Sequence, residues 1–309
     1  MEFPISHGSI RAEQFSELLG NPRVRPFAER MLTTSYVECV PGHEEAMREI
    51  MARSFDLLTA ARGDDRQFRT AAATVVGDLF HKSDPDFWFN RVYRHYKRAI
   101  KPERRFAILR GLLCGERVLD LGCGDGLTSL ALSRHGYQVL LTDVLDYRDE
   151  TARALPFAPM ADPAAIPYPD QSADSAIVMA VLHHVEPEQL MTLLGELRRV
   201  CRRVVVEEDC YGVPADLPGL ADVLEQDAFL REFVALAPED QLRFLMFVDY
   251  FANVIAQGLG QMDMPFGFRT VPDWWAGFAA CGFRVEQTLL LGFQRGNFNR
   301  SCHVWFVLE

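Results

Sequence analysis

The stretch Val118-Leu119-Asp120-Leu121-Gly122-Cys123-Gly124-Asp125-Gly126 decides the fold of this chain. The apolar run that ends at Leu121 predicts a buried β-strand, and apolar residues at helical spacing after Gly126 predict a helix that ends before Gly136. Glycines between the strand and the helix permit a tight turn, leave no Cβ over the groove and free backbone N–H groups at the start of the helix. The sequence therefore predicts a nucleotide-binding turn at this junction.

The spacing of the glycines distinguishes this turn from the dinucleotide pattern G-x-G-x-x-G, because the third glycine of that pattern would fall on Leu127. NAD and FAD are therefore disfavoured. The form D-L-G-C-G-D-G instead resembles motif I of the class I S-adenosylmethionine-dependent methyltransferases. The resemblance implies S-adenosylmethionine as the cofactor, and it assigns Asp120, Gly122, Cys123 and Gly124 to the binding site.

An acidic residue ends the next expected strand, which runs from Gln138 to Thr142. The carboxylate of Asp143 at the tip of that strand can accept hydrogen bonds from both ribose hydroxyls of the cofactor, and charged acceptors form the stronger bonds. Val144 follows and is expected along the adenine face. We therefore predict that cofactor binding depends on Asp143 more than on any other side chain.

A second acidic residue lies in the stretch 160–170, which resembles the family segment in which an acidic residue precedes an L-P-F turn. In that resemblance Asp162 accepts a hydrogen bond from the adenine amino group, and Ile166-Pro167-Tyr168 is the turn. The neighbouring Ala161 and Pro163 join the expected cofactor site. A solvated loop residue is the alternative interpretation of Asp162.

Two adjacent histidines follow the fourth expected strand, which runs from Asp174 to Leu182, and Ala180 in that strand is expected to border the cofactor. His183 and His184 suggest a metal site or a general base. Neighbouring residues on an extended chain point to opposite sides, however, and many members of the family carry such histidines without a metal. We therefore expect no metal, and we keep both histidines as candidate catalytic residues.

The remaining pattern continues a regular alternation of strands and helices. A helix from Glu188 to Val200 precedes a strand from Arg203 to Val206, and Ser301 to Leu308 resembles the antiparallel last strand of the family. The resemblance implies an α/β fold with a Rossmann-like sheet of seven strands, the last of them antiparallel. We expect the S-adenosylmethionine-binding catalytic domain to occupy residues 111–309.

Two regions outside this core are expected to be helical. Residues 1–110 show apolar residues at helical spacing and are expected to form a helical N-terminal extension that acts as a lid, with Tyr96 and Arg98 as candidates to cover the cofactor. Residues 210–264 are expected to form a helical insertion between strands five and six at the acceptor site. An apolar stripe in the insertion indicates either a helix core or a wall for a hydrophobic acceptor.

The composition disfavours several kinds of partner. With 32 Lys and Arg against 43 Asp and Glu, the net charge is −11, which disfavours binding to the phosphates of nucleic acid. The seven cysteines form no C-x-x-C pair, and no signal peptide or long apolar run is visible, which indicates a cytoplasmic protein outside the membrane. We expect a small-molecule substrate, and the sequence leaves the oligomeric state open.

Methyl transfer to a small acceptor is the function that these features favour. The acceptor is expected to be hydrophobic or aromatic and to belong to secondary metabolism, and S-adenosylhomocysteine is the expected second product. Candidate catalytic residues follow strands four and five or lie in the insertion. They are His183, His184, Glu207, Asp249 and Tyr250. Glu207 begins a run of three carboxylates with Glu208 and Asp209, which we expect to face water rather than to hold a divalent ion.

Two other functions remain open. In the first, the methionine amine of the cofactor attacks its own γ-carbon and gives azetidine-2-carboxylate and methylthioadenosine, and an acceptor site plugged by aromatic residues would fit that cyclisation. In the second, the chain binds the cofactor or a partner without catalysis. The presence of both Asp143 and Asp162 argues against the second function.

Overall fold

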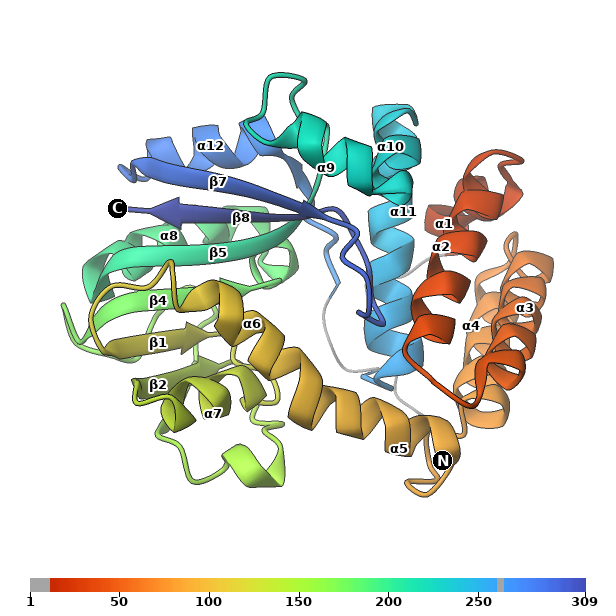
Figure 1. Cartoon of the computed structure of the whole chain (residues 1–309), viewed down its shortest axis with the longest axis horizontal. Coiled ribbons are helices and arrows are strands. Elements are labelled where there is room, and N and C mark those ends of the chain that lie inside the picture. Colours follow the sequence, from red (N-terminus) through yellow and green to blue (C-terminus); the bar gives the residue numbers. More distant parts are fainter. Residues whose placement is uncertain (1–11, 260–263) are drawn as a thin grey trace. The chain divides into compact units, whose positions relative to one another are not determined.

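The computed structural model describes residues 12–259 and 264–309 (Figure 1). The chain divides into two compact units, each of which combines segments that lie far apart in the sequence. Of the described residues, the helical unit contains 12–94, 220–259, 264–268 and 292–302, and the sheet unit contains 95–219, 269–291 and 303–309. Residues 1–11 of the expected extension and 260–263 of the expected insertion lie outside the described residues.

The sheet unit contains one sheet whose strands follow the order β3-β2-β1-β4-β5-β8-β7, with the short β6 beside β5 (Figure 1). β1 pairs in parallel with β2 and β4, and β5 pairs in parallel with β4 but antiparallel with β8. The expected Rossmann-like sheet with an antiparallel last strand is therefore confirmed. The strands are Arg117–Leu121 (β1), Gln138–Asp143 (β2), Phe157–Pro159 (β3), Ala173–Met179 (β4), Cys201–Tyr211 (β5), Arg269–Thr270 (β6), Val285–Gly292 (β7) and His303–Leu308 (β8).

Continuous apolar runs explain the central strands. β1 and β4 are buried along almost their whole lengths, as expected for parallel strands that are covered on both faces. Val118, Ile177 and Trp305 from three strands share a core cluster with Leu132 of α7. Burying a large apolar side chain contributes about 1.5–3 kcal/mol relative to leaving it exposed. The helices of this unit are Lys101–Leu109 (α6), Leu127–Arg134 (α7), Pro187–Val200 (α8) and Val271–Ala280 (α12), with the π-helical segment Tyr96–Ile100 (η2) and the 3₁₀ turns Glu150–Ala152 (η3) and Leu182–His184 (η4).

Two strands end at different places from those that the sequence predicted. β4 stops at Met179 instead of continuing to Leu182, because Ala180 has a positive φ of 59° and turns the chain. β5 continues to Tyr211 instead of ending at Val206, because its far half pairs with β8. Both differences change the edge of the sheet where ligands bind in folds of this kind.

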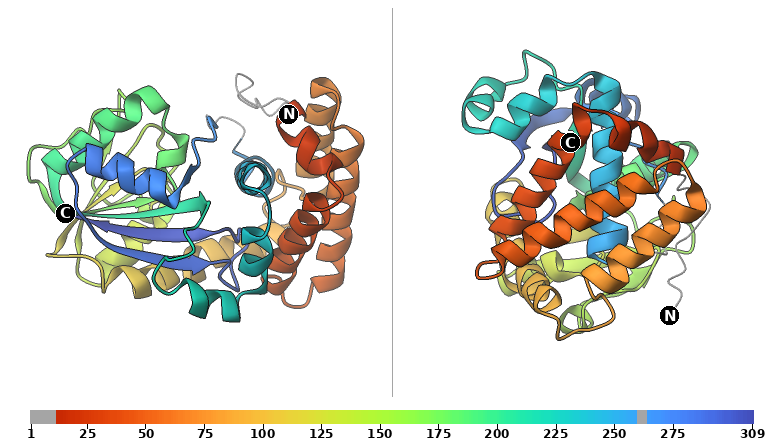
Figure 2. Two further views of the ribbon diagram at one scale, coloured as in Figure 1. Left: turned by 90° about the horizontal axis from the view of Figure 1, so that it is seen from above. Right: turned by 90° about the vertical axis from the view of Figure 1, so that its right-hand side faces the viewer.

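The helical unit contains the N-terminal helices and the helices of the segment 220–268 (Figure 2). α2 packs against α3 and α11, and α1 packs against α11. No helix in residues 12–259 and 264–309 is both long enough and apolar enough to cross a membrane. The helices are Ala12–Gly20 (α1), Val24–Glu38 (α2), Glu44–Ala60 (α3), Asp65–Thr74 (α4), Trp88–His95 (α5), Leu220–Gln226 (α9), Ala228–Val234 (α10) and Pro238–Tyr250 (α11), with the π-helical segments Val75–Leu79 (η1) and Phe251–Ala256 (η5).

Aromatic side chains form the core of the helical unit. Phe27 of α2 packs on Phe244 with ring centroids 4.9 Å apart, and Phe247 lies 5.6 Å from Phe15 and 5.5 Å from Phe55. Such aromatic pairs contribute about 0.5–1.5 kcal/mol beyond the area that they bury. The apolar stripe expected in the insertion is therefore the core of a helix bundle.

The segment that connects β7 to β8 also belongs to the helical unit. In residues 292–302, Asn299 accepts a hydrogen bond from the hydroxyl of Tyr36 at 3.0 Å. Arg300 is only 2% exposed and forms an ion pair with Glu38. Nothing in the local sequence predicted this long-range packing.

Candidate functional site

The order of the strands in the sheet indicates where the candidate site lies. Because β1 lies between β2 and β4, the direction in which strands are added reverses between β1 and β4. Parallel sheets bind ligands outside the carboxyl ends of their strands at such a switch point. The glycine turn follows β1 and the histidine pair follows β4, so both predicted motifs lie at this edge.

The glycine turn and the acidic residue that ends β2 are in direct contact. The backbone N–H of Gly124 donates to Asp143 Oδ2 at 2.8 Å, and that of Leu145 donates to Oδ1 at 3.3 Å. Burial raises the pKa of Asp143 above its usual value, although the backbone N–H donors act in the opposite direction. The carboxylate is thus held in one orientation beside the turn.

The first glycine of the turn has no room for a side chain. Gly122 has a φ of 68°, and a Cβ there would lie 2.5 Å from Cγ2 of Val181. Val181 belongs to the segment after β4, so the two loops that border the switch point touch each other. Sequence reasoning did not identify Val181.

Replacing Gly122 with alanine should destabilise the protein by at least about 1–2 kcal/mol, the cost of a left-handed conformation for a residue with a Cβ. The overlap with Val181 adds to that cost. Urea unfolding measures the effect. The matched control is Gly195→Ala in α8, where no atom lies within 4 Å of the added Cβ and where alanine should stabilise the helix by about 0.5–1 kcal/mol. Equal stability of Gly122→Ala and wild type would contradict the contact.

The third residue of the turn lies under a tyrosine that the sequence did not single out. Gly124 has a φ of 55°, and the hydroxyl oxygen of Tyr147 is 3.4 Å from the position that its Cβ would take. Burial, together with the charges of Asp143 and Asp125, raises the pKa of Tyr147. Its phenol therefore stays protonated against the turn.

Two residues of motif I are buried beneath this surface. Asp120 is 2% exposed and accepts a hydrogen bond from Ser129 Oγ of α7 at 2.7 Å. Burial raises the pKa of Asp120 to about 7. Burial also raises the pKa of the Cys123 thiol, which makes it unreactive. Asp120 links β1 to α7 and supports the turn from within the unit.

Lys97, and not the expected Arg98, is the side chain of the helical segment before β1 that contacts the glycine turn. Lys97 Nζ lies 2.7 Å from Asp125 Oδ2 in the glycine turn. The guanidinium of Arg98, the expected candidate, is held by Asp149 and Glu150, each at 2.9 Å. Tyr96 is buried, with 6% of its surface exposed. The sequence predicted Arg98 as the cation near the cofactor, but in the structure Lys97 is the one that pairs with the glycine turn.

The segment with the second acidic residue lies beside Asp143. Met160 donates its backbone N–H to the carbonyl of Asp143 at 2.9 Å, which brings the exposed residues Ala161, Asp162 and Pro163 to this edge. Asp162 Oδ1 accepts from the backbone N–H of Ala164 at 2.9 Å. Val144 is 49% exposed on the same loop region, next to Asp143. Ala180, also expected here, follows the end of β4 and donates its N–H to the Glu207 carbonyl at 2.8 Å.

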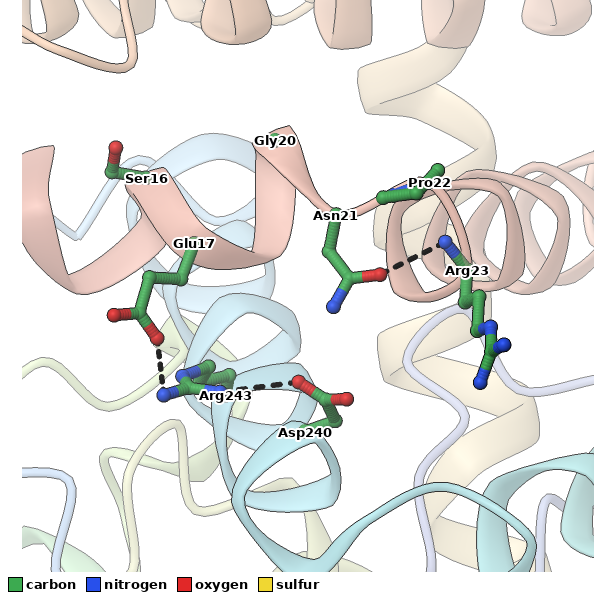
Figure 3. Close-up of a pocket in the computed structure, with 8 residues that line it drawn as sticks. All are labelled: Ser16, Glu17, Gly20, Asn21, Pro22, Arg23, Asp240 and Arg243. Atoms are coloured by element: carbon green, nitrogen blue, oxygen red, sulfur yellow. Dashed lines mark hydrogen bonds and ion pairs between the residues drawn. The ribbon is translucent and has the colours of Figure 1, made fainter.

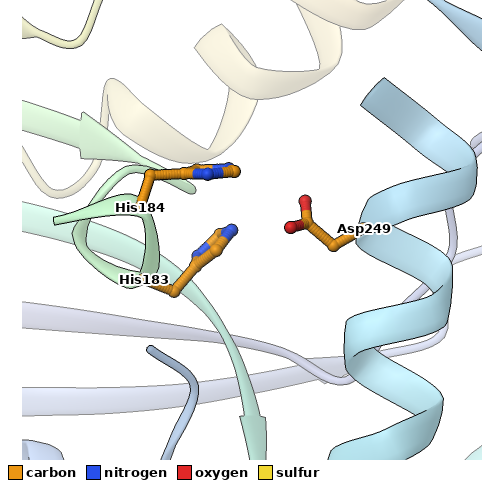
Figure 4. A group of neighbouring side chains, drawn as sticks. All are labelled: His183, His184 and Asp249. Carbon is orange, nitrogen blue, oxygen red and sulfur yellow. The ribbon is translucent and has the colours of Figure 1, made fainter. Parts of the chain in front are cut away.

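The two histidines lie on η4, where their ring centroids are 4.3 Å apart (Figure 4). The expectation that they point to opposite sides is wrong, because strand pairing ends at Met179 and the chain then turns. His183 is 1% exposed, and its Nδ1 lies 2.6 Å from Oε2 of Glu208. Oε1 of Glu208 accepts the backbone N–H groups of Val181 at 3.2 Å and Leu182 at 2.7 Å.

The run of carboxylates on β5 is fully engaged within the sheet unit. Glu207 Oε2 accepts from Arg105 at 2.7 Å, and Asp209 Oδ1 lies 2.8 Å from Nδ1 of His303. With Glu208 bound to the histidine turn, the expectation that all three carboxylates face water is wrong. All three carboxylates lie within β5, because this strand continues past Val206 to Tyr211.

The pair of His303 and Asp209 should make stability depend on pH. Burial lowers the pKa of His303, but Asp209 and also Glu207, 4.0 Å away, outweigh this effect and that of Arg105, so the pKa of His303 is raised. A raised pKa gives stability that is complete below the unfolded value of about 6.5 and is lost as the pH rises through the folded value. Wild type should therefore exceed His303→Gln in unfolding free energy by more at about pH 5.5 than at about pH 9. Urea unfolding at both pH values tests this, and an equal difference would refute it.

The remaining catalytic candidates belong to the helical unit. Asp249, which Figure 4 also draws, lies on α11 and accepts a hydrogen bond from Asn253 Nδ2 at 2.7 Å. Tyr250 is 1% exposed, and its ring packs on Phe15 with centroids 5.0 Å apart. Burial raises the pKa of Tyr250, so its hydroxyl stays protonated.

The helical unit also carries an open pocket of about 710 Å³ (Figure 3). Arg243 bridges Glu17 and Asp240 in this pocket, and the backbone N–H of Arg23 donates to Asn21 Oδ1 at 2.9 Å. None of the predicted site residues lines this pocket. Its lining residues are Ser16, Glu17, Gly20, Asn21, Pro22, Arg23, Asp240 and Arg243.

Comparison with known proteins agrees with the strand order and the glycine turn. Residues 119–204 match the family of methyltransferase domains. This match agrees with the resemblance of motif I to the class I S-adenosylmethionine-dependent methyltransferases. It supports S-adenosylmethionine as the cofactor, as motif I implied.

Solved structures of methyltransferases also resemble the chain. One from Methanosarcina mazei, described as S-adenosylmethionine-dependent, has 18% sequence identity and a TM-score of 0.44 over 65% of this chain and 95% of that chain. Another from Mesorhizobium loti has 21% identity and a TM-score of 0.44 over 66% of this chain and 96% of that chain. No curated protein sequence matches the chain.

Proposed function

We propose that the chain transfers the methyl group of S-adenosylmethionine to a small acceptor and releases S-adenosylhomocysteine. The observation that carries the proposal is the contact between the glycine turn and Asp143 at the switch point of the sheet. A glycine turn alone is common in nucleotide-binding proteins. A turn of the motif I form that is joined directly to an acidic residue at the tip of β2 fits a nucleoside with two ribose hydroxyls.

The residues at this edge fit the cofactor. Gly124 offers backbone without a side chain, and Asp143 offers a charged acceptor beside it. We assign the ribose to Asp143, the methionine end to the glycine turn, and the adenine to Val144 and the loop with Asp162. The other residues that we assign to the cofactor site are Asp120, Gly122, Cys123, Ala161, Pro163 and Ala180.

S-adenosylmethionine supplies a methyl group that is activated by a sulfonium and needs no metal to be transferred. The chain has to hold the cofactor, place the acceptor in line and exclude water. Positioning of this kind is worth about 7–11 kcal/mol of the barrier in favourable intramolecular models. Preorganised contacts such as those of Asp143 and Glu208 keep the edge of the sheet rigid for this purpose.

A small acceptor agrees with the charge of the chain, since a net charge of −11 repels phosphate-rich polymers. We propose a hydrophobic or aromatic acceptor on the composition of the chain, of which 11% is aromatic. We also propose a cytoplasmic location, because all seven cysteines of the sequence are free thiols in the structure.

Titration calorimetry with S-adenosylhomocysteine tests the proposal directly. We expect saturable binding at one site per chain, with heat that disappears when the protein is unfolded. A folded protein that binds neither S-adenosylhomocysteine nor S-adenosylmethionine would refute the proposed function.

A further inference from the structure

A row of three cations lies on the helix that precedes β1. Lys97 on η2 and Lys101 and Arg105 on α6 are spaced four residues apart, which places them on one face of the continuous helix. Lys97 pairs with Asp125 at 2.7 Å, and Arg105 pairs with Glu207 at 2.7 Å. The amine of Lys101, between them, is partly exposed and forms no hydrogen bond or ion pair with any described residue. This cation row therefore has one member whose charge no single carboxylate of the chain neutralises.

The neighbours of Lys101 loosen its proton. Repulsion by Arg105 is the main cause that lowers the pKa of Lys101 to about 7, and burial and Lys97 act in the same direction. Attraction by Asp125 and Glu207 opposes these effects without outweighing them. An amine in this position releases its proton readily when no anion is near, and an anion that arrives beside it favours the charged form again.

The presence of a lysine at this position is informative. Of the 32 Lys and Arg in the chain, 29 are arginines, and the three lysines are Lys82, Lys97 and Lys101. Arginine keeps its charge at every physiological pH, whereas lysine loses its proton readily when burial or neighbouring charges lower its pKa. An arginine at position 101 would repel Arg105 whether or not a ligand is bound. A lysine avoids that repulsion until an anion neutralises it.

The order of the strands indicates which ligand reaches Lys101. In the proposed cofactor site the nucleoside lies at the tip of β2 and the methionine end lies at the turn after β1, whereas β4 and β5 follow on the other side of β1. The two carboxylates that attract Lys101 come from the turn after β1, through Asp125, and from β5, through Glu207. Lys101 therefore lies toward the strands beyond the cofactor, where an acceptor can approach the methyl group.

We propose that Lys101 binds a carboxylate of the methyl acceptor and takes up a proton as it does so. The inference rests on the proposed function and narrows it, because the hydrophobic or aromatic acceptor then also carries an acidic group. The acceptor carboxylate pairs with the ammonium of Lys101, between the ion pairs of Lys97 and Arg105. This local positive charge attracts an anion although the whole chain carries a net charge of −11.

Because the chain has only three lysines, the amine of Lys101 can be titrated directly. Acetic anhydride acetylates uncharged amines, and peptide mass spectrometry separates the three sites. Without ligand, the labelling of Lys101 should rise with a midpoint at about pH 7. Excess benzoate should move the midpoint upward by about one pH unit or more, which means that benzoate binds the charged form at least about tenfold more tightly. Benzamide, which has the same ring without the charge, should leave the midpoint unchanged.

Calorimetry counts the protons that accompany binding. Titration with benzoate at about pH 8, in two buffers of different ionisation enthalpy, should show that wild type takes up about one proton per benzoate. Lys101→Arg keeps the charge and should bind benzoate without proton uptake. Lys101→Met should weaken benzoate binding by about ten- to a hundredfold, as expected when an anion loses a charged hydrogen-bond donor. The matched control is Lys82→Met in the helical unit, which should behave as wild type.

Three results would overturn the proposal. The first is a midpoint near the ordinary lysine value of about 10.4 without ligand, and the second is equal titration curves with benzoate and benzamide. The third is that S-adenosylhomocysteine alone shifts the midpoint or binds more than about twofold more weakly to folded Lys101→Met, because the carboxylate at Lys101 would then be that of the cofactor. Failure of the proposed function looks different, since wild type would then not bind S-adenosylhomocysteine at all.

Discussion

Replacing Asp143 with alanine should weaken S-adenosylhomocysteine binding by about ten- to a hundredfold. The reason is that two ribose hydroxyls lose their charged acceptor, and a hydrogen bond to a charged group is worth about 1.5–3 kcal/mol. The N–H groups of Gly124 and Leu145 lose the same acceptor, so the turn also becomes less ordered before the ligand arrives. Titration calorimetry measures the dissociation constant directly.

The matched control is Asp146→Ala, which removes a carboxylate of the same loop. Asp146 is solvent-exposed and pairs with Arg148 at 2.8 Å, a contact that lowers its pKa to about 2. Its loss should leave the affinity within about twofold, because exposed ion pairs contribute about 0–1 kcal/mol. Urea unfolding of both variants separates binding from stability. Unchanged affinity in a folded Asp143→Ala protein would remove this residue from the cofactor site.

The glycine turn and the end of β2 could be predicted from the sequence, because each depends only on residues that are neighbours in the chain. The glycine turn lies where three closely spaced glycines replace side chains, and the end of β2 lies where an apolar run meets Asp143. The antiparallel β8 was predicted through a resemblance, and its pairing with β5 confirms it. These features require only neighbouring residues, which a single sequence displays.

Features that depend on strand register could not be predicted in this way. His183 and Glu208 are 25 residues apart, and only the alignment of Met179 with Glu207 brings them together. The early end of β4 depended on the backbone of Ala180, whose positive φ is rare for a residue with a side chain. The three carboxylates from Glu207 to Asp209 were expected to be solvent-exposed, because their partners on other strands and helices cannot be identified from the sequence.

Long-range packing explains why the helical regions were described only coarsely. The segment 292–302 joins the helical unit through contacts such as that of Tyr36 with Asn299, which are 263 residues apart in the chain. Arg98 was expected to cover the cofactor, yet it pairs with Asp149 and Glu150, whereas Lys97 pairs with Asp125 of the glycine turn. Helical spacing shows that a face exists, but it does not show which partners the rest of the fold will bring to it.

The products formed from S-adenosylmethionine should depend completely on whether an acceptor is present. If an external acceptor takes the methyl group, S-adenosylhomocysteine forms only when acceptor is supplied, apart from slow background hydrolysis. If the methionine amine closes on its own γ-carbon, methylthioadenosine accumulates with no second substrate. We expect the first outcome, because the contact between Asp143 and the glycine turn fits the cofactor-binding arrangement that motif I implies.

Mass spectrometry of the nucleoside products, with and without a phenol, distinguishes the two reactions. Asp143→Ala is the control for both, since it should suppress either product through weaker binding of the same cofactor. Rapid formation of methylthioadenosine without acceptor, lost in Asp143→Ala, would replace methyl transfer by cyclisation while leaving the fold and the cofactor site intact.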